Sequence, residues 1–151
     1  MSKFKFRLAT LLRLRESARD QRRSQLAEAY QAEEAILEQR RRVSEDLADL
    51  MRVCREVSGP GELNLDRLLS ARRYEVTLRA EQRDLKEKHE AVRAEVDRRR
   101  QALVAANRSV RVLELLRDRQ MEQHREEERL RQTKELDEVA GRTHGLKEAE
   151  S

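Results

Sequence analysis

The sequence predicts an all-α protein, an antiparallel two-helix coiled-coil hairpin in which the second helix overhangs the first. Charged residues make up 42% of the 151 residues and aromatic residues only 3%, whereas a typical globular domain is about 25% charged. Such a chain cannot fill the core of a sandwich, a barrel or a doubly wound sheet, but its abundant Leu, Ala, Arg, Glu and Gln are strong helix formers. One break near the middle of the chain, with apolar residues at heptad spacing on both sides, indicates two helices.

The first helix is expected from about residue 4 to about residue 57, followed by a turn over residues 58–64. Gly59 and Gly61 flank Pro60, which is the one proline of the chain. Glycine just past the last residue of a helical pattern, followed by proline, is the usual signal that ends a helix. The chain is therefore expected to reverse direction at this point.

The second helix is expected from about residue 65 to about residue 139. Asn64 can serve as its N-cap, because a side-chain oxygen there accepts a hydrogen bond from a free amide of the first turn. Gly141 is the next glycine along the chain. We therefore expect residues 1–140 to form a single coiled-coil hairpin and residues 141–151 to form a flexible tail.

The heptad positions define a seam, the line of residues along which the two helices meet. In the first helix they are Leu8, Arg15, Arg22, Ala29, Ile36, Val43, Leu50 and Val57, alternating with Leu12, Arg19, Leu26, Glu33, Arg40, Leu47 and Cys54. In the second helix they are Leu68, Glu75, Gln82, His89, Val96, Leu103, Val110 and Arg117, alternating with Ala71, Leu78, Leu85, Val92, Arg99, Ala106, Leu113 and Gln120. Alternating three- and four-residue steps keep one line of side chains facing a partner helix.

Two long helices joined by a short turn run antiparallel. Leu8 is then expected to lie beside residues near 113. The second helix is expected to overhang the first from about Arg117 to Val139, a stretch that is almost wholly charged. We expect the hairpin to be monomeric.

The distribution of charge and the single cysteine limit the environment of the protein. The formal net charge is +4, but residues 1–23 carry eight basic and two acidic side chains, whereas residues 122–151 carry six basic and nine acidic ones. Cys54 alone cannot form an internal disulfide, which fits a reducing compartment. The apolar stretches are much shorter than the roughly 20 residues of a membrane span. We therefore expect a cytoplasmic protein.

The residues expected of an enzyme are not found, so we expect no catalytic residue, no cofactor and no metal ion. Nucleophilic catalysis requires a nucleophile held beside an oriented base, and the expected turn contains neither histidine nor cysteine. His89, His124 and His144 match no metal-ligand spacing. His89 and Cys54 lie on the seam, where they are expected to fix the register and to fill a small space, respectively.

Two arginine triplets, residues 40–42 and 98–100, are weak candidates for binding nucleic acid. Three consecutive residues point around a helix and do not line one face. Acidic residues flank both triplets, and no aromatic side chains are suitably placed for stacking on bases. We interpret both triplets as solvated helix faces and expect no nucleic-acid partner.

The free ends of the hairpin carry more apolar side chains than one opposing helix can cover. These side chains are Phe4, Phe6, Leu8, Leu11, Leu12 and Leu14 on one arm and Val112, Leu113, Leu115 and Leu116 on the other. Surplus apolar surface ringed by arginine is typical of a docking site. The alternative is a locally thicker seam that closes the hairpin, and the sequence leaves both interpretations open.

The opening segment, FKFRLATLLRLRE over residues 4–16, resembles the start of the FliJ family of flagellar export proteins. The later segments LLRDRQ over residues 115–120, EEE over 126–128 and ELDEVA over 135–140 are similar to the end of that family. The resemblance implies an antiparallel coiled coil, similar to the rotor shaft of rotary ATP synthases. It further implies a protein that promotes assembly of the hexameric flagellar export ATPase, links the ATPase to the membrane export gate and handles export chaperones.

The resemblance also implies partner-binding residues and a location. The contacts with the ATPase ring would be Phe4, Phe6, Leu8, Leu11, Leu12, Arg13, Arg15, Leu113, Leu116 and Arg117. The contacts with the export gate would be Tyr74, Leu78 and Leu85, although the last two are also seam positions. The protein would act at the cytoplasmic face of the cell membrane as a peripheral component, without inserting into the bilayer.

Two alternatives from other classes stay open at this point. The equivalent stalk protein of a virulence type III secretion system would have the same hairpin. A coiled-coil scaffold or chaperone unconnected with any motor would also fit. A prefoldin-like chaperone is disfavoured, because residues 58–64 are too few for the β-hairpin through which such subunits assemble.

Overall fold

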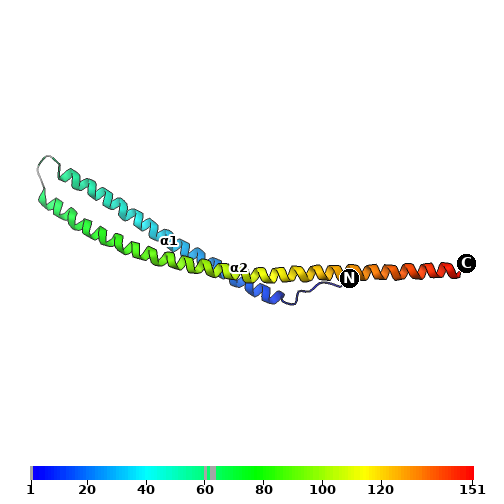
Figure 1. The fold of residues 1–151 in the computed structure, drawn as a ribbon. Coiled ribbons are helices and arrows are strands. Elements are labelled where there is room, and N and C mark those ends of the chain that lie inside the picture. Colours follow the sequence, from blue (N-terminus) through cyan, green and yellow to red (C-terminus); the bar gives the residue numbers. More distant parts are fainter. Residues whose placement is uncertain (1, 60, 62–63) are drawn as a thin grey trace. The chain divides into compact units, whose positions relative to one another are not determined.

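The computed structural model describes residues 2–59, 61 and 64–151. It contains two long helices, α1 (Ala9–Val57) and α2 (Leu65–Ala149), packed against each other as a helical hairpin (Figure 1). The expected all-α fold class is confirmed. Pro60, the expected centre of the turn, lies outside the described residues. Neither helix has, within the described ranges, the length and apolarity that a membrane span requires.

The chain divides into two compact units. Unit 1 consists of Met1–Arg19 and Ala105–Ser151, and unit 2 consists of Asp20–Val104. Unit 2 therefore contains the connection between the helices, and unit 1 contains both chain termini.

The helices of unit 2 meet along a narrow apolar seam. Near the connection, Val43 and Leu47 of α1 pack with Leu78 and Leu85 of α2, and Leu50 packs against this group. A second cluster, farther from the connection, consists of Leu26, Ala29 and Val96, with Val92 and Leu103 against it. Residue numbers fall along α2 as they rise along α1, so the helices run antiparallel, and every member of both clusters occupies a heptad position expected from the sequence.

Capping hydrogen bonds fix the two helix ends in unit 2. The side-chain oxygen of Asn64 accepts a hydrogen bond of 3.1 Å from the Arg67 amide, which is the N-cap contact expected from the sequence. At the end of α1 the Ser58 amide donates to the Cys54 carbonyl at 3.1 Å. Gly61 has a φ of +151°, a conformation that side-chain-bearing residues avoid and glycine adopts readily.

The N-terminal segment of unit 1 corrects the expected start of the first helix. Residues 2–6 have no regular secondary structure, and α1 begins at Ala9 and not at about residue 4 (Figure 1). Phe6 and Leu8 pack against a cluster of Leu12, Val110 and Leu113. Side chains are alternately half-buried and exposed from residue 4 to residue 8, and a turn closed by the hydrogen bond from the Ala9 amide to the Phe6 carbonyl at 3.2 Å precedes the helix. Packing against α2 therefore outweighs helix propensity here.

The N-terminal segment also explains where α2 loses its cover. Leu8 lies against the cluster that contains Leu113, as expected, whereas the Ser2 hydroxyl reaches the Glu128 carboxylate at 3.5 Å. Residues 2–6 have no regular structure and a turn follows at residues 7–8, whereas α2 rises about 22 Å from Leu113 to Glu128. Because a non-helical chain covers more length per residue than a helix does, the overhang begins after Glu128 and not at Arg117.

The far end of α2 corrects the expected tail. The helix continues through Gly141 and Gly145 to Ala149, so the expectation of a helix end near residue 139 was wrong, and the segment expected to form a flexible tail is helical up to Ala149. A glycine ends a helix when it adopts a left-handed conformation, and neither of these glycines has a positive φ. Each costs the helix only about 1 kcal/mol relative to alanine, which the flanking helix formers tolerate.

Candidate partner-binding surface

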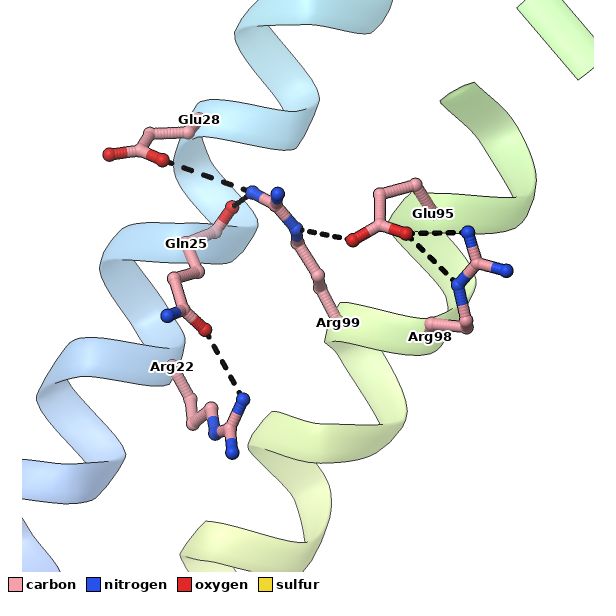
Figure 2. Close-up of polar contacts among 6 residues, drawn as sticks. All are labelled: Arg22, Gln25, Glu28, Glu95, Arg98 and Arg99. Atoms are coloured by element: carbon pink, nitrogen blue, oxygen red, sulfur yellow. Dashed lines mark hydrogen bonds and ion pairs between the residues drawn. The ribbon is translucent and has the colours of Figure 1, made fainter. Parts of the chain in front are cut away.

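Polar residues on the seam of unit 2 hold the two helices in register. Figure 2 shows Arg99 of α2 reaching across to α1, where its guanidinium donates to the backbone carbonyl of Gln25 at 2.5 Å and lies 3.9 Å from Glu28. The same guanidinium donates to Glu95 at 2.8 Å, and Arg98 donates to the other oxygen of that carboxylate. These hydrogen bonds, first that from Arg99, lower the pKa of Glu95. The arginine therefore fixes the alignment of α1 and α2 at this level.

His89 is a second polar residue on the seam. Its Nδ1 accepts a hydrogen bond from Arg40 at 3.0 Å, and its Nε2 donates to Glu33 at 3.4 Å. Both partners belong to α1, so the imidazole bridges the helices. This geometry agrees with the register role expected for His89. Within the described ranges no cluster of His, Cys, Asp and Glu could hold a metal ion.

The two arginine triplets are engaged in contacts within the hairpin. Arg41 pairs with Glu38 and Glu45 at 2.5 Å on the exposed face of α1. The hydrogen bond from Arg41 lowers the pKa of Glu38 to about 2. In the second triplet, Arg100 donates to the Tyr30 hydroxyl at 2.8 Å. Side chains held by acidic and hydroxyl partners in this way do not form a continuous basic stripe for nucleic acid.

An open groove runs between the helices of unit 1. Its lining residues are Leu11 and Arg15 of α1 and Arg108, Ser109, Val112 and Leu113 of α2. Leu11 is 37% and Val112 64% exposed. Arg15 and Arg108 border this apolar surface, so the groove combines apolar side chains with positive charge, as protein-docking surfaces do.

The structure divides the expected ATPase-contacting residues into two groups. Phe6, Leu8, Leu12 and Leu113 form the seam of unit 1, and the Phe4 ring lies tilted against the His124 ring with centroids 5.7 Å apart. The residues left accessible to a partner are Leu11, Arg13 and Arg15, which are exposed, and Leu116 and Arg117, which are half-buried. The thicker-seam interpretation therefore applies to the first group, and the docking-site interpretation stays a prediction for the second.

The expected gate-contacting residues are divided in the same way. Tyr74 is 50% exposed, whereas Leu78 and Leu85 are 3% and 4% exposed and belong to the seam of unit 2. Leu78 and Leu85 are not accessible to a partner unless the helices separate. Tyr74 is the one member of this set that a partner can reach.

Several exposed apolar residues were missed by the sequence reasoning. Leu65, Leu69 and Val76 are exposed near the start of α2, and steps of four and seven residues place them on one helix face. Their regular spacing was visible in the sequence. The seam positions Leu68 and Glu75, one residue before Leu69 and Val76, follow the same seven-residue step and mask it.

Comparison with known proteins assigns the chain to a family. The profile of the family described as "FliJ: Flagellar FliJ protein" matches residues 4–149. No curated protein and no solved structure matches the chain. The family match covers nearly the whole chain, including both helices in full and the N-terminal segment from Phe4 onward. The chain therefore belongs to the FliJ family and is a non-catalytic coiled-coil component of flagellar protein export that associates with the export ATPase.

Proposed function

We propose that unit 1 is the part of the protein that binds the flagellar export ATPase and favours assembly of its hexameric ring. The observation that carries the proposal is the groove formed by Leu11 and Val112 with Arg15 and Arg108 at its border. A partner that covers these exposed apolar groups is stabilised in the complex by about 25 cal/mol per Å² of apolar surface removed from water. The arginines add attraction for acidic surfaces and orient the encounter.

A hairpin inside a six-subunit ring cannot match all six subunits at once, because it lacks six-fold symmetry. Contacts through exposed arginines suit this mismatch, since electrostatic attraction falls off gradually with distance and does not require one fixed geometry. Arg13 and Arg15 on α1 are exposed, and residues 1–23 carry the excess of positive charge described above. We infer that these arginines supply adaptable contacts and that Leu11 and Val112 supply one specific contact.

The link to the membrane is proposed on the family membership alone. In this proposal the protein acts at the cytoplasmic face of the cell membrane, connects the ATPase ring to the export gate and receives export chaperones. Tyr74 is the expected gate residue that remains accessible. Its replacement by alanine is expected to weaken binding to the gate protein without loss of helicity.

The test of the ATPase proposal is hydrolysis of ATP by the partner ATPase, titrated with this protein. The variant Leu11→Ser with Val112→Ser removes the apolar groups of the groove. Leu37→Ser serves as a matched control, because Leu37 is an exposed leucine on α1 in unit 2, outside the groove. We expect the wild type and the control to stimulate hydrolysis equally and the groove variant to need at least about tenfold more protein for the same effect. Equal stimulation by all three would show that the groove is not the binding surface.

A further inference from the structure

A second uncovered surface lies near the start of α2, in unit 2. Leu65, Leu69 and Val76 are exposed, and steps of four and seven residues place them on one face of the helix. Leu78 is buried against α1, and it follows Leu69 by about two and a half helical turns, which places the two leucines on opposite sides of α2. The exposed face is therefore turned away from the seam and is accessible to a partner.

Arginines complete this face of α2. Arg72, Arg79 and Arg83 continue the same steps of three and four residues, and all three are exposed. Arg72 and Arg79 pair with Glu75 at 2.9 and 3.7 Å, and the Glu75 side chain is only 16% exposed, at the edge of the seam. Arg83 forms no ion pair with any residue that the structure describes. We call this face the α2 flank, and its members are Leu65, Leu69, Arg72, Val76, Arg79 and Arg83.

An open groove between the two helices adjoins the α2 flank. Its lining residues are Met51, Cys54, Arg55 and Ser58 of α1 and Arg72 of α2. Met51 is half-buried and Cys54 is buried, so the groove combines apolar side chains with the guanidinium groups of two arginines. Because Arg72 belongs to both, the flank and the groove form one continuous surface across α1 and α2.

We propose that this surface binds an acidic amphipathic helix of a partner protein. The exposed apolar residues have the spacing with which one helix packs along another. From Leu65 to Arg83 the flank is about 27 Å long, which matches a partner helix of about 18 residues. Every charged side chain named on this surface is an arginine, so carboxylates beside the apolar face of the partner are complementary to it and basic groups are repelled.

The groove favours a helix over an anionic membrane, which could also contact a face of leucine and arginine. A membrane surface is flat on this scale and would touch the flank alone, whereas a helix can lie between α1 and α2 and contact Arg55 as well as Arg72. The surface shares no residue with the groove proposed for the ATPase. Tyr74 follows Leu69 by five residues and lies on another face of α2, so the proposal is also independent of the proposed gate contact.

The test is the binding of two synthetic peptides to the full-length protein, measured by fluorescence anisotropy. Both are helix-stabilised and have leucine at the same heptad positions, but one has glutamate and the other lysine beside the apolar face. We expect the wild type to bind the glutamate peptide at least roughly tenfold more tightly than the lysine peptide. Equal affinity for the two peptides, or no binding of the glutamate peptide, would overturn the proposal.

One pair of substitutions tests the apolar part of the surface. Leu69→Ser with Val76→Ser should raise the dissociation constant of the glutamate peptide by roughly tenfold or more. Leu37→Ser with Val104→Ser is the matched control, because this leucine and valine are exposed in unit 2 (45% and 44%) but lie outside the surface. Circular dichroism should show the same helicity in both variants. If the control weakens binding as much as the test pair does, the proposal is wrong.

A second pair of substitutions tests the charges. Arg79→Gln with Arg83→Gln should weaken binding of the glutamate peptide and spare that of the lysine peptide. Arg23→Gln with Arg93→Gln removes the same net charge from exposed positions elsewhere in unit 2 and should change neither affinity.

Vesicles of equal parts phosphatidylglycerol and phosphatidylcholine test the membrane alternative. We expect any binding of these vesicles to be the same for the wild type and for Leu69→Ser with Val76→Ser. Vesicle binding that this pair abolishes would show that the surface contacts lipid and would overturn the proposal.

Discussion

The neighbouring leucines Leu11 and Leu12 provide the sharpest test of how unit 1 is organised. Leu12 is 6% exposed within the seam, and Leu11 is 37% exposed at the groove. Removal of a buried leucine side chain costs about 2–5 kcal/mol. We expect the lower end, about 2 kcal/mol, for Leu12→Ala, because a seam only two helices thick can partly close over the gap. Leu11→Ala should cost less than about 1 kcal/mol, since much of that side chain is already in water and alanine is the better helix former.

Amide hydrogen exchange over residues 9–19 measures this difference where it arises. An effect of about 2 kcal/mol accelerates exchange about 30-fold in Leu12→Ala, whereas Leu11→Ala should accelerate it less than about fivefold. Under conditions in which both variants are folded, Leu11→Ala should reduce stimulation of the partner ATPase more than Leu12→Ala does. Equal acceleration of exchange in the two variants would show that Leu11 is part of the core and would remove it from the proposed docking surface.

Three further outcomes follow from the charges and glycines. Reversal of charge at Arg13 and Arg15 should weaken stimulation of the ATPase. Added salt should weaken it too, because exposed charges are screened beyond about 10 Å at 0.1 M ionic strength. Stimulation that survives both changes would mean that the apolar groups alone bind the ATPase. The pKa of Glu38 is lowered to about 2 by its hydrogen bond with Arg41, so its stabilising contribution is fully present above about pH 4.5 and is lost as the pH falls through about 2. Thermal unfolding of wild type and Glu38→Gln should therefore converge as the pH falls towards 2, and a constant difference would contradict the assignment. Gly141→Ala should increase helicity at 222 nm, because a Cβ there meets nothing within 4 Å and the helix gains about 1 kcal/mol; reduced helicity would mean that the glycine is needed.

Much of the fold was predictable because helical periodicity is a local property of the sequence. The heptad positions Val43, Leu47, Leu78 and Leu85 were identified from spacing alone and form one cluster. Antiparallel pairing followed from the short connection, and the position of Leu8 near residue 113 followed from counting residues on each side of it.

The candidate site was predictable only as a region. The sequence showed surplus apolar residues at the free ends, but spacing could not separate Leu11 from Leu12. That separation depends on how each helix is rotated about its own axis, and the rotation is set by the packing of Leu12 against Val110 and Leu113. The non-helical start was also missed, although the alternation of Phe4, Lys5, Phe6, Arg7 and Leu8 is not a helical pattern.

The sequence by itself determined the two helices, their antiparallel order and the absence of a thick core, because helix propensity, heptad spacing and a proline between glycines act over a few residues at a time. Only the tertiary structure decided the length of α2 that is covered. That length depends on Phe6 and Leu8 finding apolar partners on α2, more than 100 residues away in the chain. Once these contacts hold the N-terminal segment in a non-helical conformation, it reaches Glu128 with fewer residues than a helix would need. The uncovered part of α2 is what remains beyond that contact.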